Sequence, residues 1–324
     1  MSVEELTGQI FLARCPDNTA VPDILTYQFG GYLLFGKDFS SSTADAVRAR
    51  LEGFQEASNL PMLIAVDEEG GTVTRVSSYT QFRSTPFPSP RSLYSQGGLD
   101  AVIEAEQEKC QLLKGLGINV ILSPVCDITT DPDAFMYKRS LGQSPAITGA
   151  FAAEACKVMA CEQVGSVLKH FPGYGNNRDT HTGIAVDSRP LEDLEEYDLI
   201  PFRAGISAGC GGILVSHIVT KSIDSNLPAS LSPKVITYLR ERLGFTGVII
   251  TDDLIMEAIT DVYGSGEAAV LAVLAGNDML CSSDYAVQYT AVLDAVKSGR
   301  IPLNQLQESV ARILLWKFKI GLLN

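Results

Sequence analysis

The stretch "KHFPGYGNNRDTHTG", from Lys169 to Gly183, holds two of the three histidines of the chain. In it Asp179 and His181 are separated by one residue, and on an extended or looped backbone such side chains can lie on the same side. A carboxylate that orients one imidazole nitrogen raises the basicity of the ring and leaves the other nitrogen for proton transfer. The pair therefore predicts a general acid/base, and the alternative is an Asx-turn beside an exposed histidine.

Asp252 and Asp253 end the apolar run "GVIITDD". A carboxylate at the end of an apolar strand costs free energy unless it is solvated, hydrogen-bonded or used in chemistry. Capping of the following helix explains Asp253 as well as a functional role does. Asp252 lies closer to the strand, so we expect its side chain to point into the site that the strand ends form.

Other polar side chains lie at similar positions in the chain. Lys169 and His170 end the run "GSVLKH", where they could donate hydrogen bonds to a ligand or pair with an acid such as Asp127 or Asp67. In "VDEEGGTVTR" two glycines permit a tight turn, which would let Asp67 and Arg75 grip one polar ligand.

The elements that must position these residues are short strands. Continuous apolar runs are typical of parallel strands that are buried on both faces, and here they alternate with segments of helical periodicity. One such segment, "SPKVITYLRERLG", has a serine N-cap, a proline at the first helical position and a glycine past its end. We therefore predict an α/β protein, one (β/α)8 TIM-type barrel that spans residues 1–324 as a single domain. The apolar runs are "QIFLA", "YLLFG", "MLIAV", "INVILS", "GSVLKH", "GGILVSH", "GVIITDD" and "NDMLC".

The alternative fold is an open doubly wound sheet, which normally carries a glycine-rich phosphate turn. The early stretch "FGGYLLFGKDF" is not a GxGxxG, so that signal is absent. In a barrel, the carboxyl ends of all strands share the face that carries active sites. Asp67, Lys169, His217 and Asp252 would then converge on one pocket, with Arg139 in "YKRSLG" as a further candidate.

Composition excludes several classes of function. A net charge of -13 argues against nucleic acid as a partner. Seven scattered cysteines without a CxxC spacing predict reduced thiols and a cytoplasmic protein, and three histidines leave little for a metal cage, so we expect no metal and no cofactor. We see no signal peptide and no apolar segment of roughly 18 residues, and so expect no membrane partner. No obligate protein partner is evident.

The motifs "AVDEEGGTVTR", "KRSLG", "KHFPGYG", "DTH" and "TDDLIM" occur in the order and at the approximate spacing of glycoside hydrolase family 3. The chain most resembles the single-domain β-N-acetylglucosaminidases of that family, the NagZ-like β-hexosaminidases that act in cell-wall recycling. It differs at Tyr174, where the family usually has histidine, and at Thr72, where arginine is common. The segment between Lys169 and Asp179 is also about one residue shorter than usual.

The resemblance implies a role for each candidate residue. Asp252 corresponds to the catalytic nucleophile, and Asp179 and His181 correspond to a general acid/base dyad. The positions that bind the sugar correspond to Asp67, Arg75, Arg139, Lys169 and His170.

The implied activity is that of a retaining exo-β-N-acetylglucosaminidase, which removes non-reducing GlcNAc from peptidoglycan-derived muropeptides through a covalent glycosyl-enzyme on Asp252. A small carbohydrate is therefore the expected partner. Within the family, a β-glucosidase or a phosphorylase is the alternative. In other classes, the alternatives are a Schiff-base aldolase that uses Lys169 and a non-catalytic sugar-binding barrel.

Overall fold

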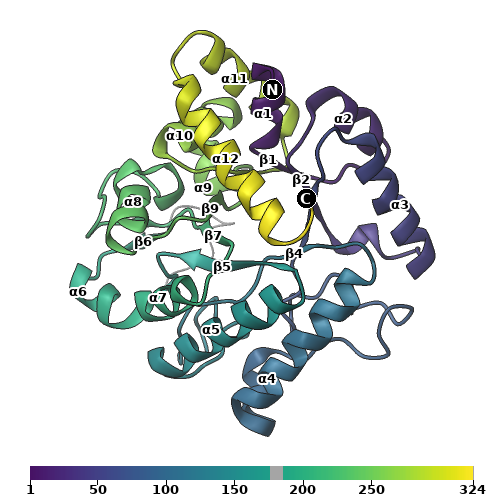
Figure 1. Ribbon diagram of the computed structural model, residues 1–324. Helices are drawn as coiled ribbons and strands as arrows, with labels where there is room; N and C mark the ends of the chain where they lie inside the picture. The colour runs from purple at the N-terminus through teal and green to yellow at the C-terminus, as the bar shows by residue number, and fades with distance from the viewer. Residues whose placement is uncertain (176–184, 324) are drawn as a thin grey trace.

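The computed structural model describes residues 1–175 and 185–323 of the chain. Among these residues, eight parallel strands form one sheet in the order β10-β1-β2-β3-β4-β5-β7-β9 (Figure 1). A parallel bridge between Ile250 and Met279 joins the two ends of that order, β9 and β10, and closes the sheet into a barrel. Each strand overlaps one of the predicted apolar runs, so the barrel prediction is confirmed. The strands are β1 (Phe11–Arg14), β2 (Gly31–Leu34), β3 (Leu63–Val66), β4 (Val120–Ile121), β5 (Gly165–Phe171), β7 (Gly212–Val215), β9 (Val248–Thr251) and β10 (Leu280–Ser282).

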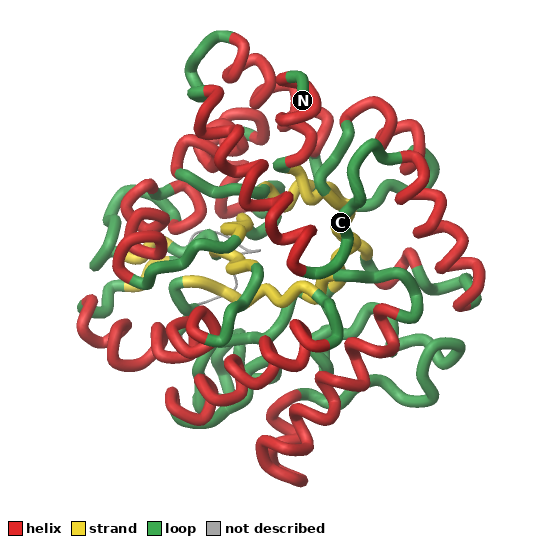
Figure 2. Tube along the Cα trace, in the orientation of Figure 1, coloured by secondary structure: helices red, strands yellow, loops and turns green. Residues whose placement is uncertain are grey.

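Helices surround the barrel, with the strands inside a ring of helical segments (Figure 2). The longest of them, α4, is interrupted at Gly97 and Gly98, where the backbone is not helical. The α-helices are α1 (Val3–Gln9), α2 (Ala20–Tyr27), α3 (Ala44–Ala57), α4 (Pro90–Lys114), α5 (Pro145–Cys161), α6 (Leu191–Asp193), α7 (Leu199–Ser207), α8 (Pro233–Thr237), α9 (Glu257–Tyr263), α10 (Ser265–Ala275), α11 (Tyr285–Lys297) and α12 (Leu303–Lys319). Short 3-10 helices are η1 (Gly36–Asp38) and η4 (Ala229–Leu231), and π-helical turns are η3 (Leu194–Asp198) and η5 (Tyr238–Arg242).

The predicted helix start at "SPKVITYLRERLG" is confirmed. Ser232 Oγ accepts a hydrogen bond from the Val235 N–H at 3.2 Å, and Pro233 occupies the first helical position. The segment is α-helical only in its first half, because η5 continues it as a π-helical turn.

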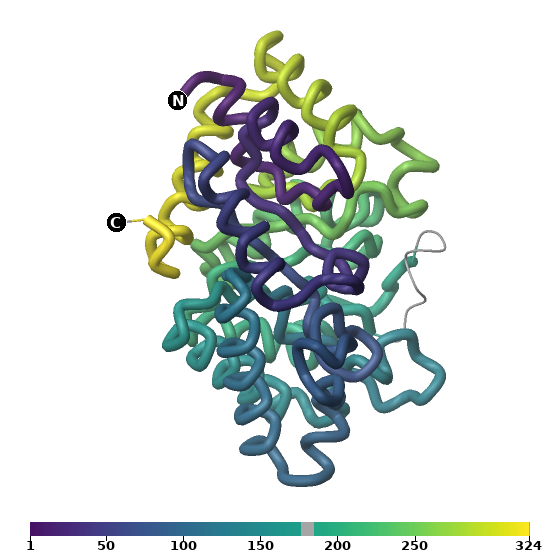
Figure 3. Tube along the Cα trace, turned by 90° about the vertical axis from the view of Figure 1, so that its right-hand side faces the viewer, coloured from purple at the N-terminus to yellow at the C-terminus, as the bar shows by residue number. Residues whose placement is uncertain are grey.

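The amino-terminal end of the barrel is closed by α12. Its Trp316 indole lies against Gly165 and Gly211, at the starts of β5 and β7. A Cβ atom on Gly211 would lie 2.0 Å from the indole nitrogen, so only glycine fits there. Both chain termini lie on the same side of the molecule (Figure 3).

Two further strands, β6 (Val186–Asp187) and β8 (Val219–Thr220), pair in parallel outside the barrel. Each has two residues, too short for any apolar pattern to reveal, and the sequence did not predict them. In the described part of the chain, no single helix is long and apolar enough to cross a membrane. The α9–α10 pair meets the length and composition requirement together, but the two helices are bent by 103° relative to one another.

Candidate active site

A cavity of about 570 Å³ opens at the carboxyl ends of the barrel strands. Its volume lies within the range of small-molecule sites. His217, which was also expected there, does not line this cavity: its buried ring lies 2.7 Å from Ser230 Oγ at Nδ1 and 3.0 Å from the Asp253 carbonyl oxygen at Nε2. The other six predicted residues that the structure describes do lie in the wall. These are Asp67, Arg75, Arg139, Lys169, His170 and Asp252.

Asp252 directly follows β9 and is fixed by the strand ladder. Its backbone N–H donates to the carbonyl of Val215 on β7 at 2.9 Å, and its Oδ1 accepts from the N–H of Asp253 at 2.9 Å. The Asp252 side chain contributes to the cavity wall, as expected for a residue at this end of a barrel strand.

Three protein donors hold the carboxylate of Asp253. Its Oδ1 accepts from the N–H groups of Ile255 and Ser283, at 3.2 and 3.1 Å, and the Ser283 hydroxyl donates to Oδ2. Burial raises the pKa of Asp253, and these hydrogen bonds oppose that rise. The prediction that Asp253 caps the following helix is wrong: α9 begins at Glu257 with Met256 at the N-cap position, and Asp253 instead holds the turn before it.

Lys169 lies at the end of β5 with its side chain 2% exposed. Its Nζ pairs with Asp67 Oδ1 at 2.6 Å and with Glu69 Oε1 at 2.5 Å. Burial alone would lower the pKa of this ammonium, but the two carboxylates raise it above its ordinary value. A Schiff-base lysine must be a neutral amine, so the site argues against the aldolase alternative.

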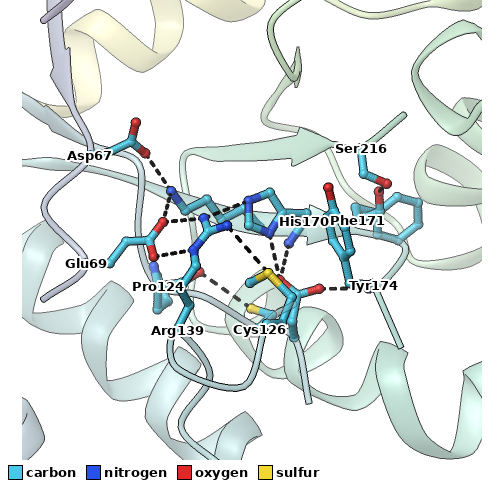
Figure 4. A network of polar contacts seen from close by, with 12 residues as sticks. Asp67, Glu69, Pro124, Cys126, Arg139, His170, Phe171, Tyr174 and Ser216 are labelled. Atoms are coloured by element: carbon cyan, nitrogen blue, oxygen red, sulfur yellow. Dashed lines mark hydrogen bonds and ion pairs between the residues drawn. The ribbon is translucent and has the colours of Figure 1, made fainter. Parts of the chain in front are cut away.

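Glu69 is the site residue that sequence reasoning missed. Its carboxylate is 1% exposed and receives two hydrogen bonds from Arg139, from Nε at 2.8 Å and from Nη2 at 2.6 Å (Figure 4). Burial opposes the charge of Glu69, but Lys169 and Arg139 hold the pKa of its carboxyl well below the usual range. Glu69 is therefore the shared counter-ion of two candidate sugar ligands.

His170 is held on both ring nitrogens. Nδ1 lies 2.7 Å from Asp127 Oδ2, and Nε2 lies 3.2 Å from Arg139 Nη2. Both contacts are satisfied when the neutral ring donates from Nδ1 and accepts at Nε2. Asp127 also accepts from the backbone N–H of His170 at 3.1 Å and of Tyr174 at 2.8 Å. The predicted ion-pair partners of Lys169 and His170, Asp67 and Asp127, are thus both found.

Tyr174, one of the positions at which the chain departs from the family it resembles, packs against the imidazole of His170. The two ring centroids are 5.3 Å apart at an interplanar angle of 81°, an edge-to-face contact. Tyr174 is 1% exposed and lies in the cavity wall, so it forms part of the support of His170.

Arg75 lies in the cavity wall beside the ring of Phe35, with its guanidinium carbon 5.8 Å from the ring centroid. Within the described residues its buried Nε has no hydrogen-bond partner. The turn that carries it is held by Glu68, whose Oε2 accepts from the backbone N–H groups of Arg75 and Val76 at 2.8 and 2.7 Å. Arg75 therefore reaches the predicted cavity with hydrogen-bonding capacity left for a ligand.

The predicted dyad, Asp179 and His181, lies outside the described residues. The described chain stops at Gly175 and resumes at Ala185. Gly175, the last described residue before this gap, directly follows Tyr174 of the cavity wall.

A second cavity, of about 260 Å³, lies at the amino ends of the strands beside Trp316. Its wall contains Arg312 and Lys319 but no carboxylate or imidazole, so it offers no acid/base pair. Within residues 1–175 and 185–323, no group of three histidine, cysteine or acidic side chains could hold a metal ion. The larger cavity is the candidate active site.

Comparison with known proteins agrees with this geometry. Over 329 residues the chain is 30% identical to the β-hexosaminidase LpqI of Mycobacterium tuberculosis, covering 98% of this chain and 83% of LpqI. It is 36% identical over 258 residues to a β-hexosaminidase of Xylella fastidiosa, covering 77% of this chain and 75% of the relative. A solved family 3 β-N-acetylglucosaminidase from a Paenibacillus species matches with a TM-score of 0.93 and 31% identity, covering 99% of this chain and 63% of that one. The present chain thus spans less than two thirds of the Paenibacillus protein.

The match at family level covers nearly the whole chain. The model described as "Glycosyl hydrolase family 3 N terminal domain" matches residues 2–315. Together with the relatives at 30% identity or more, this match shows that the chain belongs to glycosyl hydrolase family 3.

Proposed function

We propose that the protein is a retaining exo-β-N-acetylglucosaminidase that removes non-reducing GlcNAc from its substrates. One observation carries the proposal: Asp252 and the five candidate sugar ligands, which are scattered between positions 67 and 252, line one cavity. The relatives are a β-hexosaminidase and a β-N-acetylglucosaminidase, which supports the amino sugar as substrate.

In the proposed first step, the Asp252 carboxylate forms a bond to the anomeric carbon while the bond from that carbon to the leaving oxygen breaks. His181, oriented by Asp179, gives its proton to the leaving oxygen. In the second step, water attacks the glycosyl-enzyme, His181 takes a proton from the water, and Asp252 leaves as a carboxylate. Both steps invert the anomeric centre, so the product retains the β configuration.

The charged network supplies both donors and acceptors for the sugar. The Lys169 ammonium has three N–H groups, of which Asp67 and Glu69 use two, so one is left for a hydroxyl. Asp67 is 17% exposed and can accept from the same sugar. Both nitrogens of His170 are used within the protein, so we assign His170 to orienting Arg139 rather than to donating directly.

In more detail, the proposed natural substrate is a GlcNAc-containing muropeptide derived from peptidoglycan, and the proposed place of the reaction is the cytoplasm. This part of the proposal is supported by the likeness of the motifs to those of cell-wall recycling enzymes. The cysteines agree with a reducing compartment, since the seven thiols are all unpaired and six of them are buried.

The test compares aryl β-N-acetylglucosaminide with aryl β-glucoside as substrates for the wild type, Asp252→Ala, His181→Ala and the control Asp294→Asn. Asp294 is an exposed residue of α11. We expect the wild type and the control to cleave the amino sugar with release of the β anomer, which proton NMR detects, and both active-site variants to lose most activity.

Each other result has a definite meaning. Cleavage of the glucoside alone would favour the β-glucosidase alternative. Faster turnover with inorganic phosphate and formation of a sugar phosphate would favour the phosphorylase. Binding of GlcNAc without turnover of either glycoside would indicate a non-catalytic sugar-binding barrel.

A further inference from the structure

Arg189 lies between two buried carboxylates beyond the cavity. It grips Asp187 with its Nε and Nη2, at 3.0 and 2.7 Å from Oδ2, and its backbone N–H donates to Asp187 Oδ1 at 2.9 Å. Its Nη1 donates to Asp198 Oδ2 at 2.6 Å. The side chains of Asp187 and Asp198 are 4% and 1% exposed and that of Arg189 is 33% exposed, so in this cluster (the Arg189 clamp) the two carboxylates are shielded from water and the guanidinium is partly exposed.

The Arg189 clamp touches the chain on both sides of residues 176–184. On the leading side, a Cβ atom on Gly175 would lie 2.6 Å from Arg189 Nη2, and one on Gly173 would lie 2.8 Å from Asp198 Oδ1. The backbone of the glycines is therefore in direct contact with the clamp. On the trailing side, Asp187 is itself a residue of β6.

On the trailing side, the pairing of β6 with β8 also holds the chain in place. Val186 and Asp187 pair with Val219 and Thr220 of β8, and the N–H of Lys221 donates to the Asp187 carbonyl at 2.9 Å. The clamp thus joins β6 to Asp198, the last residue of η3, and to the turn that follows β5.

The two carboxylates of the clamp also depend on the positive charge of Arg189. Removing one partner from a buried ion pair leaves an uncompensated charge, which is strongly destabilising. Arg189 is the cation that faces both carboxylates, and burial raises the pKa of Asp198 to about 6 even beside it. Above that pH, the buried Asp198 carboxylate is charged and needs Arg189 beside it.

We propose that Arg189 is a positioning residue for the proton transfers of the reaction: with Asp187 and Asp198 it fixes the separation of the two chain ends between which Asp179 and His181 lie. The proposal rests on the proposed function, because it assigns the acid/base role to those two residues. A small displacement of a catalytic group costs on the order of 100-fold in rate, so a clamp at both ends has a measurable effect.

The alternative is that the clamp only stabilises the fold. The two roles differ in their dependence on the leaving group. A mispositioned acid/base slows the cleavage of substrates whose leaving oxygen needs a proton, whereas an activated phenol leaves without one. A mispositioned acid/base also slows the attack of water on the glycosyl-enzyme. Azide restores the rate of that step, because the anion attacks the anomeric carbon without needing a base and expels the Asp252 carboxylate.

The experiment measures kcat and KM of Arg189→Ala and Arg189→Lys on chitobiose and on dinitrophenyl β-N-acetylglucosaminide, with and without azide. The matched control is Arg240→Lys, because Arg240 pairs with the buried Asp278 at the opposite end of the barrel. His181→Ala serves as the reference for a lost acid/base. Thermal unfolding is followed for every variant.

We expect Arg189→Ala to lower kcat on chitobiose by on the order of 10- to 100-fold with little change in KM. Its loss on the dinitrophenyl substrate is smaller and is partly restored by azide, with the glycosyl azide as product. Arg189→Lys keeps the positive charge, so we expect its kcat on chitobiose to lie between those of Arg189→Ala and the wild type. In the control Arg240→Lys, we expect the ratio of kcat on chitobiose to kcat on the dinitrophenyl substrate to equal that of the wild type.

An equal loss on both substrates without azide rescue, in either Arg189 variant, would overturn the positioning role. If Arg189→Ala does not fold, Arg189→Lys still decides the question. Absence of the leaving-group effect in His181→Ala would instead refute the proposed function, so the two failures are distinguishable.

Discussion

Replacement of Glu69 by Gln tests whether the buried counter-ion organises sugar binding. Glutamine has nearly the same shape as glutamate, so the change removes the charge and replaces one acceptor oxygen by an NH2 group. At the Oε1 position that group would face Lys169 Nζ and Arg139 Nη2, now 2.5 and 2.6 Å away, and at the Oε2 position it would face Arg139 Nε, now 2.8 Å away. In either orientation at least one donor faces another donor and must turn toward a different acceptor.

The magnitude follows from the two functions of the carboxylate. Removing one member of a buried ion pair costs about 3 to 5 kcal/mol of stability, and since Lys169 keeps Asp67, we expect about 3 kcal/mol. A hydrogen bond from a charged donor contributes about 1.5 to 3 kcal/mol. Misplacing one such donor to the sugar lowers kcat/KM by about 10- to 100-fold and weakens inhibition by free GlcNAc by a similar factor.

The assay combines kcat/KM on aryl β-N-acetylglucosaminide, inhibition by GlcNAc, and urea unfolding. Asp278→Asn is the matched control, because Asp278 is also a fully buried carboxylate between two arginines, Arg240 and Arg312, but at the amino end of β10. We expect similar stability losses in both variants and a loss of GlcNAc affinity only in Glu69→Gln. If Glu69→Gln loses stability but keeps wild-type kcat/KM and inhibition, the assigned role is refuted.

Two further predictions concern stability at the amino-terminal end of the barrel. Burial lowers the pKa of Lys317 to about 7, so the unfolded chain binds its proton more tightly, and the wild type gains stability as pH rises from 7 toward 10.5. Lys317→Met should therefore stabilise the protein by on the order of 3 kcal/mol at pH 7 and by less at pH 10, and equal gains in urea unfolding at both pH values would contradict this. Gly211→Ala places a Cβ 2.0 Å from the Trp316 indole nitrogen and should cost about 1 to 3 kcal/mol, whereas an unchanged melting temperature would show that the indole can move aside.

Much of the fold was predictable because each barrel strand is buried on both faces. The burial is complete in β2, β3, β4, β5, β7, β9 and β10, and in β1 only Arg14 is partly exposed. A strand that is buried on both faces is typically a continuous apolar run. Helix details were less predictable. Residues 191–209 have helical periodicity throughout, but they form α6, the π-helical turn η3 and α7 in succession. Their hydrogen-bond register depends on packing rather than on periodicity.

The positions of the candidate site residues were predictable for a related reason. A charged residue at the end of an apolar run marks the carboxyl end of a strand, and barrel closure brings all such ends to one face. Lys169 and Asp252 were identified in this way. Which acid pairs with which base was not predictable, since Arg139 and Glu69 are 70 residues apart and meet only through closure of the barrel.

Glu69 nevertheless carried a signal in its spacing. Asp67 and Glu69 are two residues apart and both contact Lys169, as side chains on one face of an extended segment do. Glu68 between them turns the other way and binds the backbone of Arg75 and Val76. The same rule led to the pairing of Asp179 with His181. The described chain obeys this rule after β3, where two acids converge on one cation. The rule that predicts the dyad is therefore the one that should also have identified Glu69.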